Sequence, residues 1–302
     1  MGKTALGVRL AARYSGEIIS ADSRQVYTGL DIGSGKDLKD YDILVGGERV
    51  HIPYHLIDVC TLEREFNLFD FQEGFYSAFE DISSRKKLPI CVGGTGMYVD
   101  SILRKYDMIP VPENPGLEAE LRQKSLSELE SILVAEKEKL HNTTEFGDKE
   151  RVIKAIVINR FNKSDECARL RACLRRPDVR PLVVGTTLDR AVVRERIARR
   201  LSQRLDEGMI DEVRGLHEHG ASWERLCSLG LEYRFVSEYL QGKIETKEKL
   251  YELLNLAIGQ FAKRQETWFR GMEKKGVKIN WLPKDADTDA RFRAACALWE
   301  VA

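Results

Sequence analysis

The sequence lacks several features that would assign it to large classes of protein. None of its apolar stretches approaches the ~18 residues of a membrane span, which argues against a membrane-spanning protein. Its six cysteines form no CxxC pair, and no histidine stands at zinc-ligand spacing from them, which argues against a zinc finger. Scattered cysteines without a signal peptide predict free thiols in the reducing cytoplasm.

The sequence also lacks net charge, but its charges are segregated. It holds 48 Lys+Arg and 48 Asp+Glu, yet the block from Arg151 to Arg204 holds 15 of the former and 5 of the latter. This block carries a net charge of +10, and the remainder carries −10. A basic block predicts a surface for a polyanion such as a nucleic acid, and a solvated surface is the alternative.

Proline is scarce, and its distribution marks two linkers. Five of the eight prolines fall in Ile109–Gly116 and Arg175–Pro181. Because proline fixes φ and disfavours helix in the residue before it, both stretches predict linkers. Between them apolar residues recur at three-to-four spacing, which predicts a helical insertion of about sixty residues. We therefore expect a core formed by residues 1–112 and 181–302, with an inserted helical domain at 113–180.

Outside this insertion, short apolar segments alternate with helical patterns. The alternation predicts an α/β fold with a doubly wound parallel sheet. The expected strands are Glu17–Ser20, His55–Val59, Leu88–Val92, Pro181–Val184 and Val277–Leu282.

Two long helical segments are expected in the C-terminal third, Asp189–His219 and Lys247–Arg270. The first carries an apolar residue at every fourth position from Val193 to Leu205, a row that we expect in the core. The arginines that flank this row would face solvent or phosphate; they are Arg196, Arg199 and Arg200.

The chain opens with Gly2-Lys3-Thr4 in front of a helical pattern, as in the second half of a phosphate-binding loop. In such a loop, backbone N–H groups and the helix N-terminus favour an anion, Lys3 adds positive charge and Thr4 can hold Mg²⁺. The strand and first glycine of a complete loop are absent from the sequence. The first fifteen residues resemble a transit peptide, but we interpret them as the helix after this loop. A second glycine-lysine segment, Asp31–Lys36, is interpreted as a turn.

Polar residues follow two of the expected strands. Asp22 comes at the end of the first, where α/β sheets place their ligands, and could act as a base or as a partner of magnesium. Its alternative role is to cap a helix. Gly93, Gly94 and Thr95 follow another strand, where glycines let the backbone approach a ligand. A tight strand–helix turn is the alternative there.

The segment Gln260–Gly271 interleaves cations with aromatic side chains. This mixture suits phosphates and unstacked bases, and the alternative is an amphipathic helix that packs on the core. The side chains concerned are Phe261, Lys263, Arg264, Trp268, Phe269 and Arg270.

Taken together, these segments resemble the tRNA dimethylallyltransferase (isopentenyl-tRNA transferase) family, in its bacterial form. The matching segments are GKTAL, EIISADSRQVYTGLDIGSGK, PYHLIDV, PICVGGTGMYVDSIL, DKERVIKAI, GMIDEVRGL, LGLEYRF and QFAKRQETWFR, between Gly2 and Leu282. The resemblance implies a P-loop kinase-like core with an inserted helical domain that binds tRNA. It also implies transfer of a dimethylallyl group from dimethylallyl diphosphate to the exocyclic amine of the adenine beside the tRNA anticodon.

The resemblance implies roles for individual residues. Gly2, Lys3 and Thr4 would hold the diphosphate, Thr4 together with Mg²⁺ as cofactor. Asp22 would be the general base, with Thr95 beside the reacting groups. The target nucleotide would be lined by Ser23, Arg24 and Gln25. The anticodon stem-loop would be contacted by Arg151, Tyr233, Arg234, Lys263, Arg264, Gln265, Thr267, Trp268 and Arg270. We expect a cytoplasmic monomer.

The sequence departs from the family pattern at several places. The family's phosphate loop reads G-x-T-x-x-G-K-[ST] after a buried strand, and because its first half is missing here we expect a truncated chain or a misassigned start. Glu118 stands near the place of a family arginine that contacts tRNA. The segment LGLEYR carries one or two residues more than the commoner G-Y-R. A C-terminal zinc finger of the eukaryotic kind is absent.

Three other functions share parts of this pattern. A dimethylallyltransferase that acts on free adenine nucleotides needs the same core but little tRNA surface. A small-molecule P-loop kinase would share Gly2-Lys3-Thr4 without a basic insertion. A catalytically inactive tRNA-binding protein could follow from the incomplete phosphate loop. The basic block and the KRQETWFR segment favour tRNA as the substrate.

Overall fold

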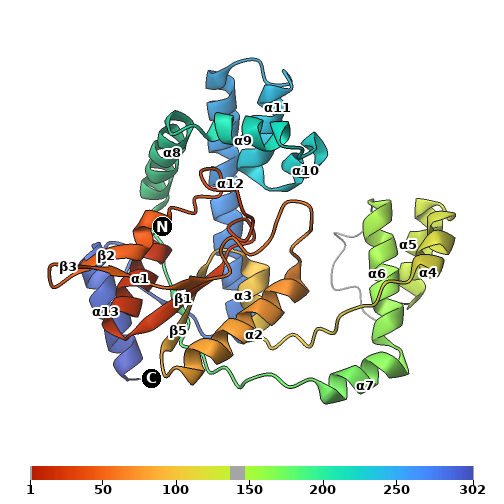
Figure 1. The fold of residues 1–302 in the computed structure, drawn as a ribbon, viewed down its shortest axis with the longest axis horizontal. Helices are drawn as coiled ribbons and strands as arrows, with labels where there is room; N and C mark the ends of the chain where they lie inside the picture. Colours follow the sequence, from red (N-terminus) through yellow and green to blue (C-terminus); the bar gives the residue numbers. More distant parts are fainter. Residues whose placement is uncertain (1, 137–146, 302) are drawn as a thin grey trace. The chain divides into compact units, whose positions relative to one another are not determined.

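The computed structural model describes residues 2–136 and 147–301, and it divides into two compact units. The first unit joins Met1–Tyr106 to Pro177–Ala302, and the second is Asp107–Arg176. Figure 1 shows the ribbon of both units, which are described separately below. None of the helices in the described residues is long and apolar enough to cross a membrane.

A parallel three-stranded sheet forms the centre of the first unit. Strand β1 (Gly16–Ala21) lies between β4 (Tyr54–His55) and β5 (Leu88–Gly93), and it pairs in parallel with both. Every residue of β1 is buried. A strand with both faces and both edges covered is what an apolar run without alternation predicts. The predicted α/β class with a parallel sheet is therefore confirmed.

Helices cover both faces of this sheet. Helix α1 (Lys3–Arg13) packs on the face that carries Ile18, and α2 (Leu68–Ser84) packs on the face that carries Ile19. Helix α3 (Gly96–Leu103) lies beside α2, and α13 (Thr288–Glu300) lies beside α1. Neighbouring residues of a strand point to opposite faces, so β1 holds the two helical layers together.

Three of the expected strands were too long: 55–59, 181–184 and 277–282. Residues 56–59 do not continue β4, because Leu56 and Asp58 adopt positive φ angles of 62° and 56°, which strands do not use. Strands β6 (Val184–Gly185) and β7 (Asn280–Trp281) are two-residue parallel partners. Pro181 has no N–H to donate, which fits the late start of β6.

The structure contains an antiparallel hairpin that was not predicted from the sequence. Strands β2 (Asp42–Val45) and β3 (Glu48–His51) follow the short 3₁₀ helix η1 (Leu38–Tyr41) and are joined by Gly46-Gly47. Both glycines have positive φ, as the tight turn of a hairpin requires. This Gly-Gly pair was the available signal.

The C-terminal part of the first unit is helical. Its helices are α8 (Arg190–Asp206), α9 (Met209–Glu218), α10 (Trp223–Ser228), α11 (Leu231–Leu240) and α12 (Lys247–Lys274). The expected single segment 189–219 is broken by Gly208, whose φ of 100° ends α8 and starts α9. Helix α12 packs against α8 and α11 at one end and against α3 at the other (Figure 1).

The second unit holds four helices in its described residues. They are α4 (Pro115–Arg122), α5 (Leu126–Glu136), α6 (Lys149–Asn162) and α7 (Asp165–Cys173). Helices α4, α5 and α6 share an apolar core that includes Leu121, Leu133 and Ile156. This unit therefore has a hydrophobic core of its own.

Candidate active site

The carboxyl ends of β1 and β5 meet at one edge of the sheet and bring two predicted site residues together. The Thr95 N–H donates to Ala21 O at 3.2 Å, and the Ser23 N–H donates to Thr95 Oγ1 at 3.0 Å. A Cβ atom on Gly93 would lie 2.1 Å from Ala21 O, so this approach requires glycine. The turn that carries Asp22 is thus bonded directly to the turn that carries Thr95.

Asp22 lies in a turn that leaves one of its carboxylate oxygens without a hydrogen bond to the described residues. The Arg24 N–H donates to Asp22 Oδ1 at 2.9 Å, which fixes the carboxylate just beyond β1. Its other oxygen makes no hydrogen bond with the described part of the chain. The predicted alternative, a helix cap, does not apply, because Asp22 precedes a series of turns.

Lys3 faces this edge from the start of α1. Gly2 caps the helix with a φ of 76°, and Lys3 is the first helical residue. A Cβ atom on Gly94 would lie 3.6 Å from Lys3 Nζ, so the ammonium group reaches the turn after β5. Burial lowers the pKa of Lys3, the Asp22 carboxylate opposes this effect, and the Arg200 guanidinium adds to it. Thr4 follows in the first helical turn and is half-buried.

Two arginines of α8 join the site, and the sequence analysis named one of them without placing it. Arg200 forms an ion pair with Asp37 and acts electrostatically on Lys3. Arg204, one turn later, is half-buried against Gly35. The available signal was the i, i+4 spacing of two arginines beside an apolar row. Lys3, Arg200 and Arg204 bring positive charge to a region whose nearby acids include Asp22 and Asp37.

Gln25 and Tyr233 support the loop that follows. Gln25 Nε2 donates to Gly35 O at 3.1 Å, and Gln25 Oε1 accepts from Ser20 Oγ at 3.0 Å. The Tyr233 hydroxyl donates to Glu212 Oε1 at 2.8 Å and accepts from the Ser34 N–H at 3.1 Å. Burial raises the pKa of Tyr233 well above its usual range, so the phenol stays protonated. The tRNA contact expected of Tyr233 does not fit its placement, because the side chain is 1% exposed.

Glu212 was missed by the sequence analysis. Its carboxylate accepts from three consecutive backbone N–H groups, those of Asp31, Ile32 and Gly33, at 3.0, 2.6 and 3.1 Å. Lys36 ends the same loop, where it is buried and ion-paired with Asp31 and Asp58. The segment 31–36 is therefore a turn, as predicted, and its lysine is not available to a phosphate.

The KRQETWFR segment lies on α12, and two of its side chains reach the turn after β5. Gln265 Nε2 donates to Gly94 O at 2.8 Å. A Cβ atom on Gly96 would lie 2.3 Å from Trp268 Cδ1, so the indole ring covers the start of α3. Lys263, Arg264 and Thr267 are exposed. Arg270 is also exposed and is ion-paired with Glu266 at 2.9 Å.

The other predicted tRNA contacts are exposed but ion-paired. Arg234 pairs with Glu238 at 3.8 Å and lies over the ring of Phe235. Arg151, on α6 of the second unit, pairs with Asp148 at 3.3 Å. Ion pairs between exposed side chains are weak, so both arginines can exchange their partners for a phosphate.

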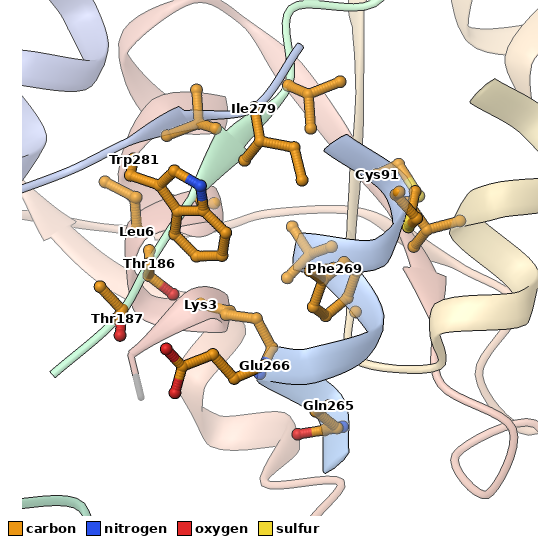
Figure 2. Close-up of a pocket in the computed structure, with 18 of the residues that line it drawn as sticks. Lys3, Leu6, Cys91, Thr186, Thr187, Gln265, Glu266, Phe269, Ile279 and Trp281 are labelled. Atoms are coloured by element: carbon orange, nitrogen blue, oxygen red, sulfur yellow. The ribbon is translucent and has the colours of Figure 1, made fainter. Parts of the chain in front are cut away.

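A cavity of about 870 Å³ opens beside this cluster in the first unit (Figure 2). One end is polar and contains Lys3, Gln265, Glu266, Thr186 and Thr187. The Thr186 hydroxyl there is buried without a hydrogen-bond partner in the described residues. The rest is apolar and lies along β5 and β6, with Leu6, Cys91, Phe269, Ile279 and Trp281 among its walls.

Comparison with known proteins identifies the family. Residues 25–272 match the family model described as IPP transferase. The tRNA dimethylallyltransferase 2 of Treponema denticola is 53% identical over 283 residues, which cover 94% of this chain and 92% of the relative. The enzyme of the same name from Syntrophotalea carbinolica is 49% identical over 286 residues, 95% of this chain and 92% of the relative. The chain belongs to the IPP transferase family.

A solved structure extends the similarity to the fold. The full-length tRNA isopentenylpyrophosphate transferase of Bacillus halodurans aligns with a TM-score of 0.65 and 29% identity, over 99% of this chain and 93% of that one. The predicted family resemblance is therefore confirmed.

Proposed function

We propose that this IPP transferase family member transfers a dimethylallyl group from dimethylallyl diphosphate to the exocyclic amine of the adenine beside the tRNA anticodon, and releases diphosphate. One observation carries the proposal. A half-buried lysine at a helix N-terminus and a fixed carboxylate meet at the carboxyl ends of two parallel strands, where α/β sheets bind their ligands. The relatives named tRNA dimethylallyltransferase support the same reaction.

The donor diphosphate would bind at the start of α1. The unpaired N–H groups of the first helical turn and the Lys3 ammonium favour an anion there. Arg200, which lowers the pKa of Lys3, would add a second cation. Two cations held close together repel, so a diphosphate between them relieves a cost that the free protein bears. Gly2 and Thr4 would complete the binding site, in what we propose to be a P-loop kinase-like core.

Magnesium would suit this site as a partner of the diphosphate. Mg²⁺ prefers oxygen ligands and usually keeps several waters, with one or two protein groups and the substrate phosphates. The Thr4 hydroxyl is an oxygen donor of this kind, and no cluster of three or more His, Cys, Asp or Glu in the described residues offers a separate metal site. When bound, the cation would offset charge that develops on the leaving diphosphate.

Asp22 would take up the proton that the reaction releases. The adenine amine attacks the first carbon of the dimethylallyl group, and a nitrogen–carbon bond forms. The bond from that carbon to oxygen breaks, and its electron pair leaves on the diphosphate. The amine then loses a proton to the Asp22 oxygen that no described group occupies. The amine lone pair is delocalised into the ring, so base assistance matters most as the new bond forms.

The target adenine would enter beside Thr95. Its amine must leave the base stack of the anticodon loop to reach a half-buried site. The Thr95 hydroxyl bonds to the Ser23 turn, which places it between the two strand ends. Ser23 and Arg24 would line the nucleotide pocket, and Gln25 would hold their turn in place.

The tRNA backbone would lie along α12 and on the second unit. Exposed Lys263, Arg264 and Thr267 supply phosphate contacts, and exposed Trp268 offers a surface for stacking. We propose that unit Asp107–Arg176 is the inserted tRNA-binding domain and that Arg151 contributes to it. We also propose a monomer that works in the cytoplasm, which suits its six free cysteines.

Labelled donor tests the proposal. Purified protein is given radiolabelled dimethylallyl diphosphate with tRNA, and separately with AMP. Label in tRNA, lost when the target adenine is replaced, supports the proposal. Label in AMP alone would make the protein a nucleotide prenyltransferase, and tRNA binding without label would make it an inactive binder.

A further inference from the structure

A half-buried arginine lies against the loop behind the candidate active site. The Arg204 side chain is 12% exposed, and its Nη1 lies 3.5 Å from Gly33 O. A Cβ atom on Gly35 would lie 1.6 Å from Arg204 Nη2, so the missing side chain of Gly35 makes room for the guanidinium. Gly35 also has a positive φ of 66°. Arginine and loop therefore fit each other closely.

Glu232 is the acidic partner of this arginine. Its Oε1 lies 3.9 Å from Arg204 Nη1, and the side chain is 23% exposed. Glu232 stands in the first turn of α11, where the helix N-terminus favours a carboxylate. Burial raises its pKa and nearby Asp22 raises it further, while Arg204 and Arg24 oppose this. The carboxylate is thus influenced by two arginines from different elements.

Both partners are connected to the turn that carries the proposed base. Gln25 Nε2 donates to Gly35 O, so the loop held by Arg204 in turn holds Gln25. The Arg24 side chain passes Gly230, the residue that precedes α11, where a Cβ atom would lie 3.1 Å from Arg24 Nε. Glu232 therefore adjoins the turn from Asp22 to Gln25 at Arg24, through the start of α11. Arg204 adjoins the same turn at Gln25, through the Gly33–Gly35 loop.

We infer that Arg204 and Glu232 are positioning residues for the transfer reaction, which hold the turn from Asp22 to Gln25 in its productive place. This inference rests on the proposed function of Asp22 as the base. Arg200 is the arginine that suits the donor, since it is 52% exposed and acts on Lys3. Arg204 is committed to the loop and to Glu232. A small shift of a reacting group costs rate and leaves the binding of the whole substrate largely intact.

The inference predicts a separation of kcat from KM. We expect Arg204→Met to lower kcat about 10–100-fold, the loss typical of a misplaced catalytic group, with the KM of dimethylallyl diphosphate within about threefold of wild type. Arg204→Lys should recover much of that loss, because it keeps the positive charge near Glu232. Glu232→Gln should act in the same direction as Arg204→Met. The double variant should lose little more than either single variant, because both remove one interaction.

The experiment measures single-turnover rates and steady-state constants on the full chain with tRNA and donor, and thermal unfolding checks that each variant folds. Arg214→Met is the matched control, since Arg214 is an exposed arginine on the neighbouring helix α9 outside the basic block 151–204, and it should behave as wild type. An increase of about tenfold or more in donor KM at unchanged kcat would show that Arg204 binds the diphosphate, which overturns the inference. So would wild-type kcat in Arg204→Met or Glu232→Gln.

Failure of a variant to fold and failure of the proposed function have different consequences for the inference. If Arg204→Met fails to fold, Arg204→Lys and Glu232→Gln decide the question by the same measurements. If wild-type protein puts no label into tRNA, the proposed function itself fails, whatever the variants do.

Discussion

Replacing Asp22 with asparagine separates the chemistry of the site from its architecture. Asparagine keeps the Oδ1 atom that accepts the Arg24 N–H at 2.9 Å, so the turn after β1 should persist. It lacks the carboxylate that would take up the amine proton. General bases contribute about 10²–10⁴-fold, so we expect kcat to fall about 100-fold or more, or about 2.7 kcal/mol in the barrier. The affinity for tRNA should remain near wild type.

The same substitution should change the behaviour of Lys3. Burial lowers the pKa of Lys3, and the Asp22 carboxylate opposes that lowering. Without the carboxylate, the pKa of Lys3 should fall further. A lysine binds diphosphate best while protonated, at pH below its pKa. We therefore expect donor affinity in Asp22→Asn to be lost at a lower pH than in wild type.

Single-turnover rates and donor affinity, each measured against pH, check both parts. Equal turnover in Asp22→Asn and wild type would refute Asp22 as the base. If Asp22→Asn and wild type lose donor affinity at the same alkaline pH, the coupling of Lys3 to Asp22 is refuted.

Three further substitutions test other parts of the structure. Arg264→Ala should weaken tRNA binding and reduce its salt slope by about one phosphate contact, measured by titration at several salt concentrations; an unchanged slope contradicts the contact. Gly96→Ala should displace Trp268 and lower tRNA affinity. Gly271→Ala on α12 is the control, because an added Cβ meets nothing within 4 Å there; equal tRNA affinities of the two variants would count against a stacking role for Trp268. Glu17→Gln should cost about 2 kcal/mol in urea unfolding at pH 7, because the 2% exposed Glu17 loses its charge beside the cations Arg85 and Lys87. The Glu17 pKa is depressed, so its contribution to the free energy of unfolding is present above about pH 4.3. That contribution is lost as pH falls from there through the depressed pKa, so the difference in stability between Glu17→Gln and wild type should shrink at low pH; a constant difference would contradict the assignment.

Local patterns predicted the elements that position the site. The sequence Gly2-Lys3-Thr4 before an apolar period predicted a helix start, and α1 begins at Lys3. The short apolar runs that became β1 and β5 could be recognised as strands without knowledge of their partners, and β1 is buried throughout. Because parallel strands end at the same edge, the polar residues after them could be expected to meet.

Contacts between distant segments could not be predicted in this way. Glu212 binds the N–H groups of a loop about 180 residues earlier in the chain, and its own sequence context is that of an ordinary helical acid. Tyr233 looked like a family contact with tRNA, but its hydroxyl binds Glu212 in the interior. Gly208 was taken as part of one long helical segment, but its φ of 100° separates α8 from α9.

The closeness of two backbones explains how donor and acceptor groups can share one site. Gly93 lies so near Ala21 that the turn after β5 and the turn after β1 are held together. The groups proposed for the diphosphate donor contact these joined turns at Gly94, which Lys3 and Gln265 both approach. The acceptor side depends on the joined turns through Thr95, whose hydroxyl bonds to the turn of Asp22. A change in the spacing of β1 and β5 would therefore move Lys3, which we propose to hold the diphosphate, relative to Asp22, which we propose as the base. The absence of a side chain at Gly93 is thus as much a part of the catalytic geometry as the charges around it.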